Sequence, residues 1–357
     1  SIYLSIYIGI FCIGFNFFSS HFSFFISHFL TSSLWVSLEY IRGHLFTGFP
    51  WGVLGYTQWN FLPIIQIADI TGVYGISFLV VLVNTAIVSS VKWDVLSKKI
   101  KLILLTSCII LICLIYGIFQ LLTINYQLSA SIKVAVLQGN VDQYKKWDQK
   151  YVTEIANTYT DLVMRANKEN PDLIIWPESA VPGYLFYDRY LYNWVLNLIK
   201  KTSAYHLIGT VDYDARQRLY NSAVLFSPTG ELLQVYRKIH LVPFGEVIPL
   251  KEILGKYIKV INELGDFYSG NEYTVFSFSI PYLLKRIARQ EALGRKNYSQ
   301  PGTKFSVSIC FESIFPYISR KFTKNGAQFL VNITIDAWFM KTSAPYQHFA
   351  FSVFRAV

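Results

Sequence analysis

The stretch KFSVSICFES, residues 304–313, alternates polar and apolar residues and then places Cys310 two residues before Glu312. Alternation with a period of two is typical of a β-strand with one buried face. The strand runs out at the cysteine, and the ends of strands are where catalytic residues gather in layered α/β folds. A single cysteine is nevertheless more often a small core residue. Its role depends on the sequence around it.

Buried strand patterns recur through the second half of the chain and alternate with helical patterns near residues 149–167, 190–201 and 315–324. The other strand patterns are IKVAVLQGN, PDLIIWPES, AYHLIGTVDY, LYNSAVLFSPTG, ELLQVYRKIHLVPFGE and AQFLVNITID. Strands that alternate with helices predict a layered α/β domain. Glu178 and Lys238 follow strand patterns in the same way as Cys310.

The first 130 residues have a different composition. Hydrophobic residues make up 53% of the chain and charged residues 15%, and only eight of the charged residues precede residue 131. The mean hydropathy of the chain is +0.35. Residues 102–122 carry no charge, which predicts a transmembrane helix because about 20 apolar residues span a bilayer. Similar stretches at 1–20, 22–38 and 64–91 raise the expectation to about four spans.

The positions of the charges predict an orientation. Lysines cluster just before the last span, at Lys92, Lys98, Lys99 and Lys101. The positive-inside rule places that loop in the cytoplasm, so the chain after residue 122 is expected to be extracytoplasmic. The net charge of +10 is dispersed and accompanies no nucleic-acid-binding motif. We therefore expect anionic lipid headgroups, and not nucleic acid, as its partner.

We expect two domains, a helical transmembrane region at residues 1–128 and an extracytoplasmic α/β domain at residues 129–357. Between residues 251 and 304 the strand and helix patterns weaken, which predicts a mobile arm. The chain opens with a long apolar run and without Met or the basic start of a signal peptide. We expect it to begin inside a larger membrane region.

Cys310, Glu178 and Lys238 have complementary chemistry. A thiol with a pKa of about 8.5 is mostly protonated at neutral pH and needs a base or a cation nearby to act as a nucleophile. A carboxylate can accept its proton, and an ammonium can stabilise both the thiolate and an oxyanion. The other three cysteines lie in the predicted membrane segments, so no disulfide is expected. His240, two residues past Lys238, is expected to pack locally.

Three blocks around these residues, PDLIIWPESAVPG, YRKIHLVPFGEVIP and VSICFES, resemble the signature blocks of the nitrilase superfamily and its Glu-Lys-Cys triad. Three more resemble the apolipoprotein N-acyltransferases, the membrane branch of that superfamily. These are EYIRGHLFTGFPWGVLGY, VLQGNVDQYKKW and NITIDAWFMKTSAPYQHFAFSVFRA. The resemblance implies an αββα sandwich for the second domain, located on the periplasmic side of the bacterial inner membrane.

The resemblance also implies a reaction. An acyl chain would pass from a phospholipid to the α-amino group of the diacylglyceryl-cysteine of an apolipoprotein, without a cofactor. Cys310 would form a thioacyl-enzyme, Glu178 would act as general base and acid, and Lys238 would hold the oxyanion. No metal is expected, because the six histidines are scattered without ligand spacing.

Further residues have an expected role and an alternative. Glu246 and Glu312 would support Lys238 and the thiol, and otherwise form structural salt bridges. Trp147 matches a family tryptophan implicated in substrate contact, and otherwise caps the core. The chain departs from the family at Ile335, where Asn is usual, and at Phe311, where Tyr is common.

Two other functions stay open. One is a membrane-anchored nitrilase-type amidase, in which water resolves the thioester. The other is a catalytically inactive scaffold that binds lipoproteins. The membrane half favours a lipid donor, and the presence of all three triad residues favours an enzyme. The chain ends at Val357, where family members continue with a strand pair and a last transmembrane helix.

Overall fold

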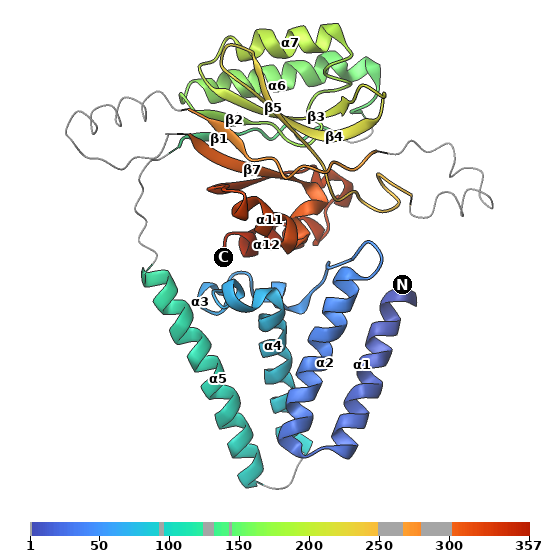
Figure 1. Cartoon of the computed structure of the whole chain (residues 1–357), viewed down its shortest axis with the longest axis vertical. Coiled ribbons are helices and arrows are strands. Elements are labelled where there is room, and N and C mark those ends of the chain that lie inside the picture. The colour runs from blue at the N-terminus through green and yellow to red at the C-terminus, as the bar shows by residue number, and fades with distance from the viewer. Residues whose placement is uncertain (1, 93–95, 124–131, 143–144, 249–266, 280–301) are drawn as a thin grey trace, which may run out of the picture. The chain divides into compact units, whose positions relative to one another are not determined.

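The computed structural model describes residues 2–92, 96–123, 132–142, 145–248, 267–279 and 302–357. The chain divides into two compact units, one of Ser1–Gln127 with Ser343–Val357 and one of Leu128–Thr342. The first unit is helical, and the second contains all the described strands (Figure 1).

The helical unit is built around α4. Helices α2 and α5 contact α4, α1 contacts α2, and the short α3 contacts α5. The bounds are α1 Ile2–His21, α2 Phe24–His44, η1 Leu54–Gln58, α3 Leu62–Ile65, α4 Ala68–Lys92, α5 Leu96–Thr123 and α12 Ala344–Arg355. Within α4 the backbone breaks at Gly72, whose φ of 63° favours glycine.

Three of these helices, within the described residues, are long and apolar enough to cross a membrane. They are Ile2–His21, Ala68–Ser90 and Leu96–Thr123. Helix α2 covers the predicted span 22–38 but carries Ser, Thr, His, Glu and Arg side chains along its length. These polar residues lower its hydropathy, so the structure has three candidate spans where about four were expected.

Helix α12, which the sequence analysis placed at the end of the α/β domain, packs within the helical unit. The Tyr56 ring on η1 lies 4.4 Å from the Phe351 ring and 5.0 Å from the Phe354 ring, measured between centroids. Arg355 donates a hydrogen bond to the Tyr56 hydroxyl. The aromatic loop before α3 is therefore buried in part against the end of the described chain.

The second unit is a sandwich of two sheets. The first has the order β1-β2-β3-β4-β5, with β1, β2 and β3 parallel and β4 and β5 antiparallel. In the second, β7 pairs antiparallel with β6 and parallel with β8. The bounds are β1 Val134–Val136, β2 Leu173–Ile175, β3 Tyr205–Tyr213, β4 Leu219–Phe226, β5 Leu232–Arg237, β6 Phe276–Phe278, β7 Thr303–Ile309 and β8 Phe329–Ile333.

Helices cover the outer faces of both sheets. Helices α6 (Val152–Asn167) and α7 (Arg189–Ile199) lie over the five-stranded sheet, and α11 (Pro316–Lys324) lies on the side of the three-stranded sheet (Figure 1). Strand β4 contacts β7 between them. The prediction of membrane-compatible helices followed by an αββα domain is confirmed. The short helices η2 (Gln149–Tyr151), η3 (Cys310–Ile314) and η4 (Asp336–Phe339) complete this unit.

The core under α6 and α7 follows from helical periodicity. Ile155, Tyr159 and Val163 recur every four residues on α6 and are buried. The Tyr159 ring stacks on Trp176, 5.2 Å between centroids, just beyond the end of β2. Helix α6 therefore packs directly over the strand end that precedes Glu178.

Part of the expected arm belongs to the core. Phe276 and Phe278 of β6 are buried, and both rings contact Phe305 of β7. A three-residue strand is too short for its periodicity to be recognised in the sequence. The remainder of the expected arm, residues 251–266 and 280–301, lies outside the described residues.

Candidate functional site

Glu178 lies in the turn that follows β2. Ser179, the next residue, has a φ of 44°, so the chain turns sharply directly after the carboxylate. Strand β3 approaches this turn closely at Gly209, where an added Cβ would lie 2.2 Å from the Pro177 carbonyl oxygen and 2.7 Å from the Glu178 Cα. Only glycine fits there, and its presence fixes the position of Glu178 over the sheet.

Lys238 follows β5 and is 1% exposed. Its main chain continues the sheet, because its N–H donates to the Asn221 carbonyl of β4 at 2.8 Å. Its own carbonyl accepts a hydrogen bond from the Gly270 N–H, also at 2.8 Å. Both backbone groups of Lys238 are hydrogen-bonded, which fixes the position of its main chain and hence of the atom from which the buried side chain extends.

A network of charges surrounds the Lys238 ammonium. Its Nζ lies 2.9 Å from Oε1 and 2.8 Å from Oε2 of Glu246, and 3.8 Å from Oε1 of Glu178. Asn221 Nδ2 donates to Glu178 Oε1 at 2.8 Å and to Glu246 Oε1 at 2.7 Å. One amide thus bridges the two carboxylates that share one lysine.

The pKa of Lys238 follows from this network. Burial disfavours the charged ammonium, but the carboxylates of Glu178 and Glu246 outweigh it and raise the pKa of Lys238. The lysine is therefore a permanent cation in the site. Glu246 is held in place by the Val242 N–H, which donates to its Oε2 at 2.8 Å.

Cys310 stands where β7 passes into η3. Its φ of 52° lies in the left-handed region, which is sparsely populated by residues with side chains and is enriched at active sites. Burial raises the pKa of the Cys310 thiol above its usual range. Glu178 raises it further, whereas Lys238 and a hydrogen bond with Thr334 lower it. Glu178 and Lys238 thus both influence the thiol, which is protonated at rest.

Glu312 has a different environment from Glu178 and Glu246. It is fully buried and accepts four hydrogen bonds. The donors are the Tyr236 hydroxyl at 2.7 Å and the N–H groups of Ile239 at 2.7 Å, His240 at 3.0 Å and Ile309 at 2.8 Å. Burial raises the pKa of Glu312, although these donors and Lys238 oppose it. The carboxylate ties the backbone after β5 to the end of β7.

The remaining expected residues lie around this centre. Trp147 is 48% exposed, with its ring 6.2 Å from that of Tyr184. His240 bonds the Tyr317 hydroxyl at 2.8 Å and stacks on Phe315, so it packs locally as expected. At Ile335, where the family usually has Asn, the main-chain N–H donates to Glu178 Oε2 at 3.2 Å. Because the main chain makes this hydrogen bond, it does not depend on which side chain stands at position 335.

Sequence reasoning missed two residues of this site, Asn221 and Lys146. Lys146 is buried, and its Nζ lies 3.2 Å from the main-chain oxygen of Glu178. Neither residue ends a strand or belongs to a block quoted for the triad. An inward-facing Asn in the strand pattern LYNSAV was the available signal for Asn221.

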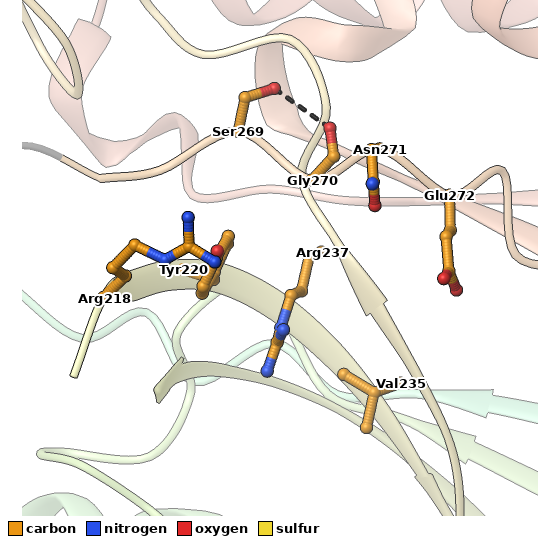
Figure 2. Close-up of a pocket in the computed structure, with 8 residues that line it drawn as sticks. All are labelled: Arg218, Tyr220, Val235, Arg237, Ser269, Gly270, Asn271 and Glu272. Atoms are coloured by element: carbon orange, nitrogen blue, oxygen red, sulfur yellow. Dashed lines mark hydrogen bonds between the residues drawn. The ribbon is translucent and has the colours of Figure 1, made fainter. Parts of the chain in front are cut away.

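A separate cavity of about 460 Å³ lies beside β5. Figure 2 shows Arg218, Tyr220 and Arg237 on one side of it, with Ser269, Gly270, Asn271 and Glu272 on the other. Arg237 directly precedes Lys238, and consecutive residues of a strand point to opposite faces. The cavity contains none of the expected site residues. Within the described part of the chain, no group of His, Cys, Asp and Glu could hold a metal ion.

Comparisons with known proteins match both units. Residues 133–357 match the carbon-nitrogen hydrolase family, and residues 1–86 match the apolipoprotein N-acyltransferase N-terminal domain. An apolipoprotein N-acyltransferase of Geobacter metallireducens is 39% identical over 91% of this chain and 59% of its own length. One of Haemophilus ducreyi is 32% identical over 99% of this chain and 66% of its own length.

The chain therefore spans about three fifths to two thirds of the curated relatives it matches. The solved structure of Saccharomyces cerevisiae Nit3, of the nitrilase superfamily, is 18% identical with a TM-score of 0.36, covering 57% of this chain and 64% of that one. The expected resemblance to apolipoprotein N-acyltransferases is confirmed, and the chain belongs to the carbon-nitrogen hydrolase family.

Proposed function

We propose that the chain is part of an apolipoprotein N-acyltransferase, with Cys310 as nucleophile, Glu178 as general base and acid, and Lys238 as oxyanion stabiliser. The observation that carries the proposal is the buried lysine shared by two carboxylates, whose charges act on a strand-end thiol. The candidate membrane spans favour a phospholipid as the acyl donor. The names of the matched relatives support the same reaction.

In the first half-reaction Glu178 removes the thiol proton as the sulfur of Cys310 attacks the ester carbonyl of the phospholipid. A base is needed because burial raises the pKa of the thiol. The Lys238 ammonium stabilises the oxyanion of the tetrahedral intermediate. When the intermediate collapses, the carbon–oxygen bond breaks, and the lysophospholipid oxygen takes the proton from Glu178. The acyl chain remains on Cys310 as a thioester.

In the second half-reaction the neutral α-amino group of the apolipoprotein attacks the thioester carbonyl. Glu178 accepts a proton from the attacking nitrogen, and Lys238 again holds the oxyanion. The carbon–sulfur bond then breaks, the sulfur recovers a proton from Glu178, and an amide is released. The two half-reactions use the same three side chains in alternate protonation states.

The supporting residues have distinct roles in this proposal. Glu246 orients Lys238 through its close ion pair, and Glu312 fixes the backbone between β5 and β7. Trp147, exposed beside Tyr184, contacts the substrate. The lysines in the first turns of α5 favour a periplasmic catalytic domain on the inner membrane.

The test uses the complete protein in detergent micelles, incubated with a phospholipid that carries a labelled acyl chain. We expect a label on the wild-type protein that hydroxylamine removes and that an apolipoprotein peptide accepts as an amide. The Cys310→Ala variant should retain no label. Hydrolysis of small amides without any labelling would identify an amidase instead, and undiminished peptide acylation by Cys310→Ala would exclude Cys310 as the nucleophile.

A further inference from the structure

Three lysines stand close together between β1 and α6, and one of them differs from the others. Lys145 and Lys150 have side chains that are 45% and 65% exposed, and they pair with Glu154 at 3.7 Å and Asp148 at 3.0 Å. Lys146 is only 4% exposed. Burying a lysine costs free energy of folding unless its charge has a partner. The burial of Lys146 therefore needs a physical reason.

The partner of Lys146 is the turn that carries Glu178. Its Nζ donates to the main-chain oxygen of Glu178 at 3.2 Å. That carbonyl belongs to the peptide between Glu178 and Ser179, where φ becomes positive. The hydrogen bond therefore fixes the sharp turn in addition to the close approach of Gly209. A neutral donor would be enough for this contact alone.

The charge of Lys146 adds a second effect. Burial lowers the pKa of Lys146 to about 8, and the Glu178 carboxylate acts in the opposite direction. At neutral pH the side chain is therefore still mostly an ammonium, within electrostatic reach of Glu178. The other groups that face Glu178 are Lys238, Glu246 and the Cys310 thiol. With Lys146 included, two cations, Lys146 and Lys238, lie near the two carboxylates of Glu178 and Glu246.

We propose that Lys146 is a positioning residue for Glu178, which holds the turn that carries the carboxylate and supplies a second positive charge near it. This inference rests on the proposed function, in which Glu178 is the base that removes the thiol proton. A base with only one shared lysine nearby would have to compete with Glu246 for that charge.

The experiment compares Lys146→Met with Lys146→Arg and with the matched exposed control Lys145→Met. It measures the rate of Cys310 acylation against pH, with labelled phospholipid and, in parallel, with p-nitrophenyl butyrate. We expect Lys146→Met to be slower by about tenfold near neutral pH, with its acidic limb moved up by about one pH unit. Lys146→Arg should restore part of the rate, and Lys145→Met should match the wild type.

Thermal unfolding separates positioning from a purely structural role. Methionine removes a buried charge but also the hydrogen bond to the Glu178 carbonyl, so the two effects oppose each other and Lys146→Met should unfold at nearly the wild-type temperature. An unchanged pH profile in Lys146→Met overturns the inference, as does a slower rate accompanied by a lower unfolding temperature and an unmoved acidic limb. If neither wild type nor Lys145→Met takes an acyl chain from phospholipid, the proposed function fails. The butyrate profiles then still decide the role of Lys146.

Discussion

Two clusters of cations and carboxylates lie on either side of β5, and they differ in burial and in how the charges are shared. Around the cavity of Figure 2, Arg218 and Arg237 are 38% and 35% exposed, and each pairs with one aspartate, at 2.5 Å and 2.6 Å. On the other side, Lys238 is 1% exposed and lies between Glu178 and Glu246, 12% and 13% exposed.

The difference shows which arrangement can do chemistry. In the two arginine pairs each charge has its own partner, and the partly exposed guanidinium groups are screened by water although Asp214 and Asp212 are only 13% and 9% exposed. A buried cation shared by two carboxylates is held closely by one of them, Glu246, and leaves the other, Glu178, at 3.8 Å. The cavity of Figure 2 is thus a weaker candidate for the catalytic site. The cluster of Lys238, Glu178 and Glu246 near the Cys310 thiol is the better candidate.

The largest expected effect comes from removing the shared cation. Lys238→Met leaves two carboxylates buried without their lysine, which we expect to destabilise the protein by about 3–5 kcal/mol. If Lys238 stabilises the oxyanion as proposed, acylation of Cys310 should fall by at least about 10³-fold. Thermal unfolding and labelled-phospholipid incorporation measure the two effects.

Arg218→Met is the matched control for the surface cluster. Asp214 keeps hydrogen bonds from the main-chain N–H groups of Arg216 at 2.9 Å and of residue 218 at 3.0 Å. We expect a much smaller loss of stability than in Lys238→Met, and unchanged acylation, because water screens the exposed arginine. Equal losses in both variants would mean that the two clusters do not differ in the way described.

An intermediate effect is expected at the amide that bridges the two carboxylates. Asn221→Asp replaces a donor with a third carboxylate around one lysine, with almost no change in shape. We expect a loss of about 3 kcal/mol in stability, since the added charge is buried without a partner. Displacement of Glu178 should also slow acylation by about 100-fold.

Asn193→Asp provides the comparison, because Asn193 is an exposed asparagine on α7 in the same unit. It should change neither stability nor acylation measurably. If Asn221→Asp acylates Cys310 at the wild-type rate, the amide bridge does not position the carboxylates, and sharing of the lysine alone would explain their arrangement.

The contrast between these residues also explains what the sequence could predict. Glu178, Lys238 and Cys310 each follow a strand pattern, and the edge of a layered sheet brings strand ends together. Asn221 lies inside β4. The alternation of residues along this strand predicts that the Asn221 side chain faces inward, but not which residue of the adjacent strand lies beside it. That neighbour depends on the register of β4 with β5, in which Ser222 pairs with Arg237. Register between strands cannot be read from one sequence.

Longer-range features were less accessible still. The packing of α12 on η1 joins residues about 300 positions apart, such as Tyr56 and Arg355, and no sequence pattern pairs segments so far apart. Strand β6 was assigned to an arm because three residues carry too little periodicity. The membrane-compatible helices were predicted well, since a long uncharged apolar run is rare outside helices that span a bilayer.

The smallest expected effect concerns a buried titratable group without a counter-charge. His206 is fully buried, bonded to Trp176 Nε1 at 3.1 Å and Thr202 Oγ1 at 2.9 Å, and burial lowers the pKa of His206 to about 3. Unlike Lys238, it is therefore neutral. Since the unfolded pKa is about 6.5, the unfolded chain binds the proton more readily between these values. The stability contribution of neutral His206 is complete above about pH 6.5 and is lost as pH falls.

His206→Gln retains a donor and an acceptor for the same neighbours but cannot titrate. Between about pH 6.5 and about pH 5.5 the wild type should lose up to about 1.4 kcal/mol more than the variant, because one pH unit corresponds to that free energy. Thermal unfolding of both proteins across this range measures the difference, in which contributions common to both proteins cancel. Parallel curves would mean that His206 becomes protonated without unfolding. Burial alone would then not suffice to neutralise a group, and the contrast with Lys238 would rest on the carboxylates only.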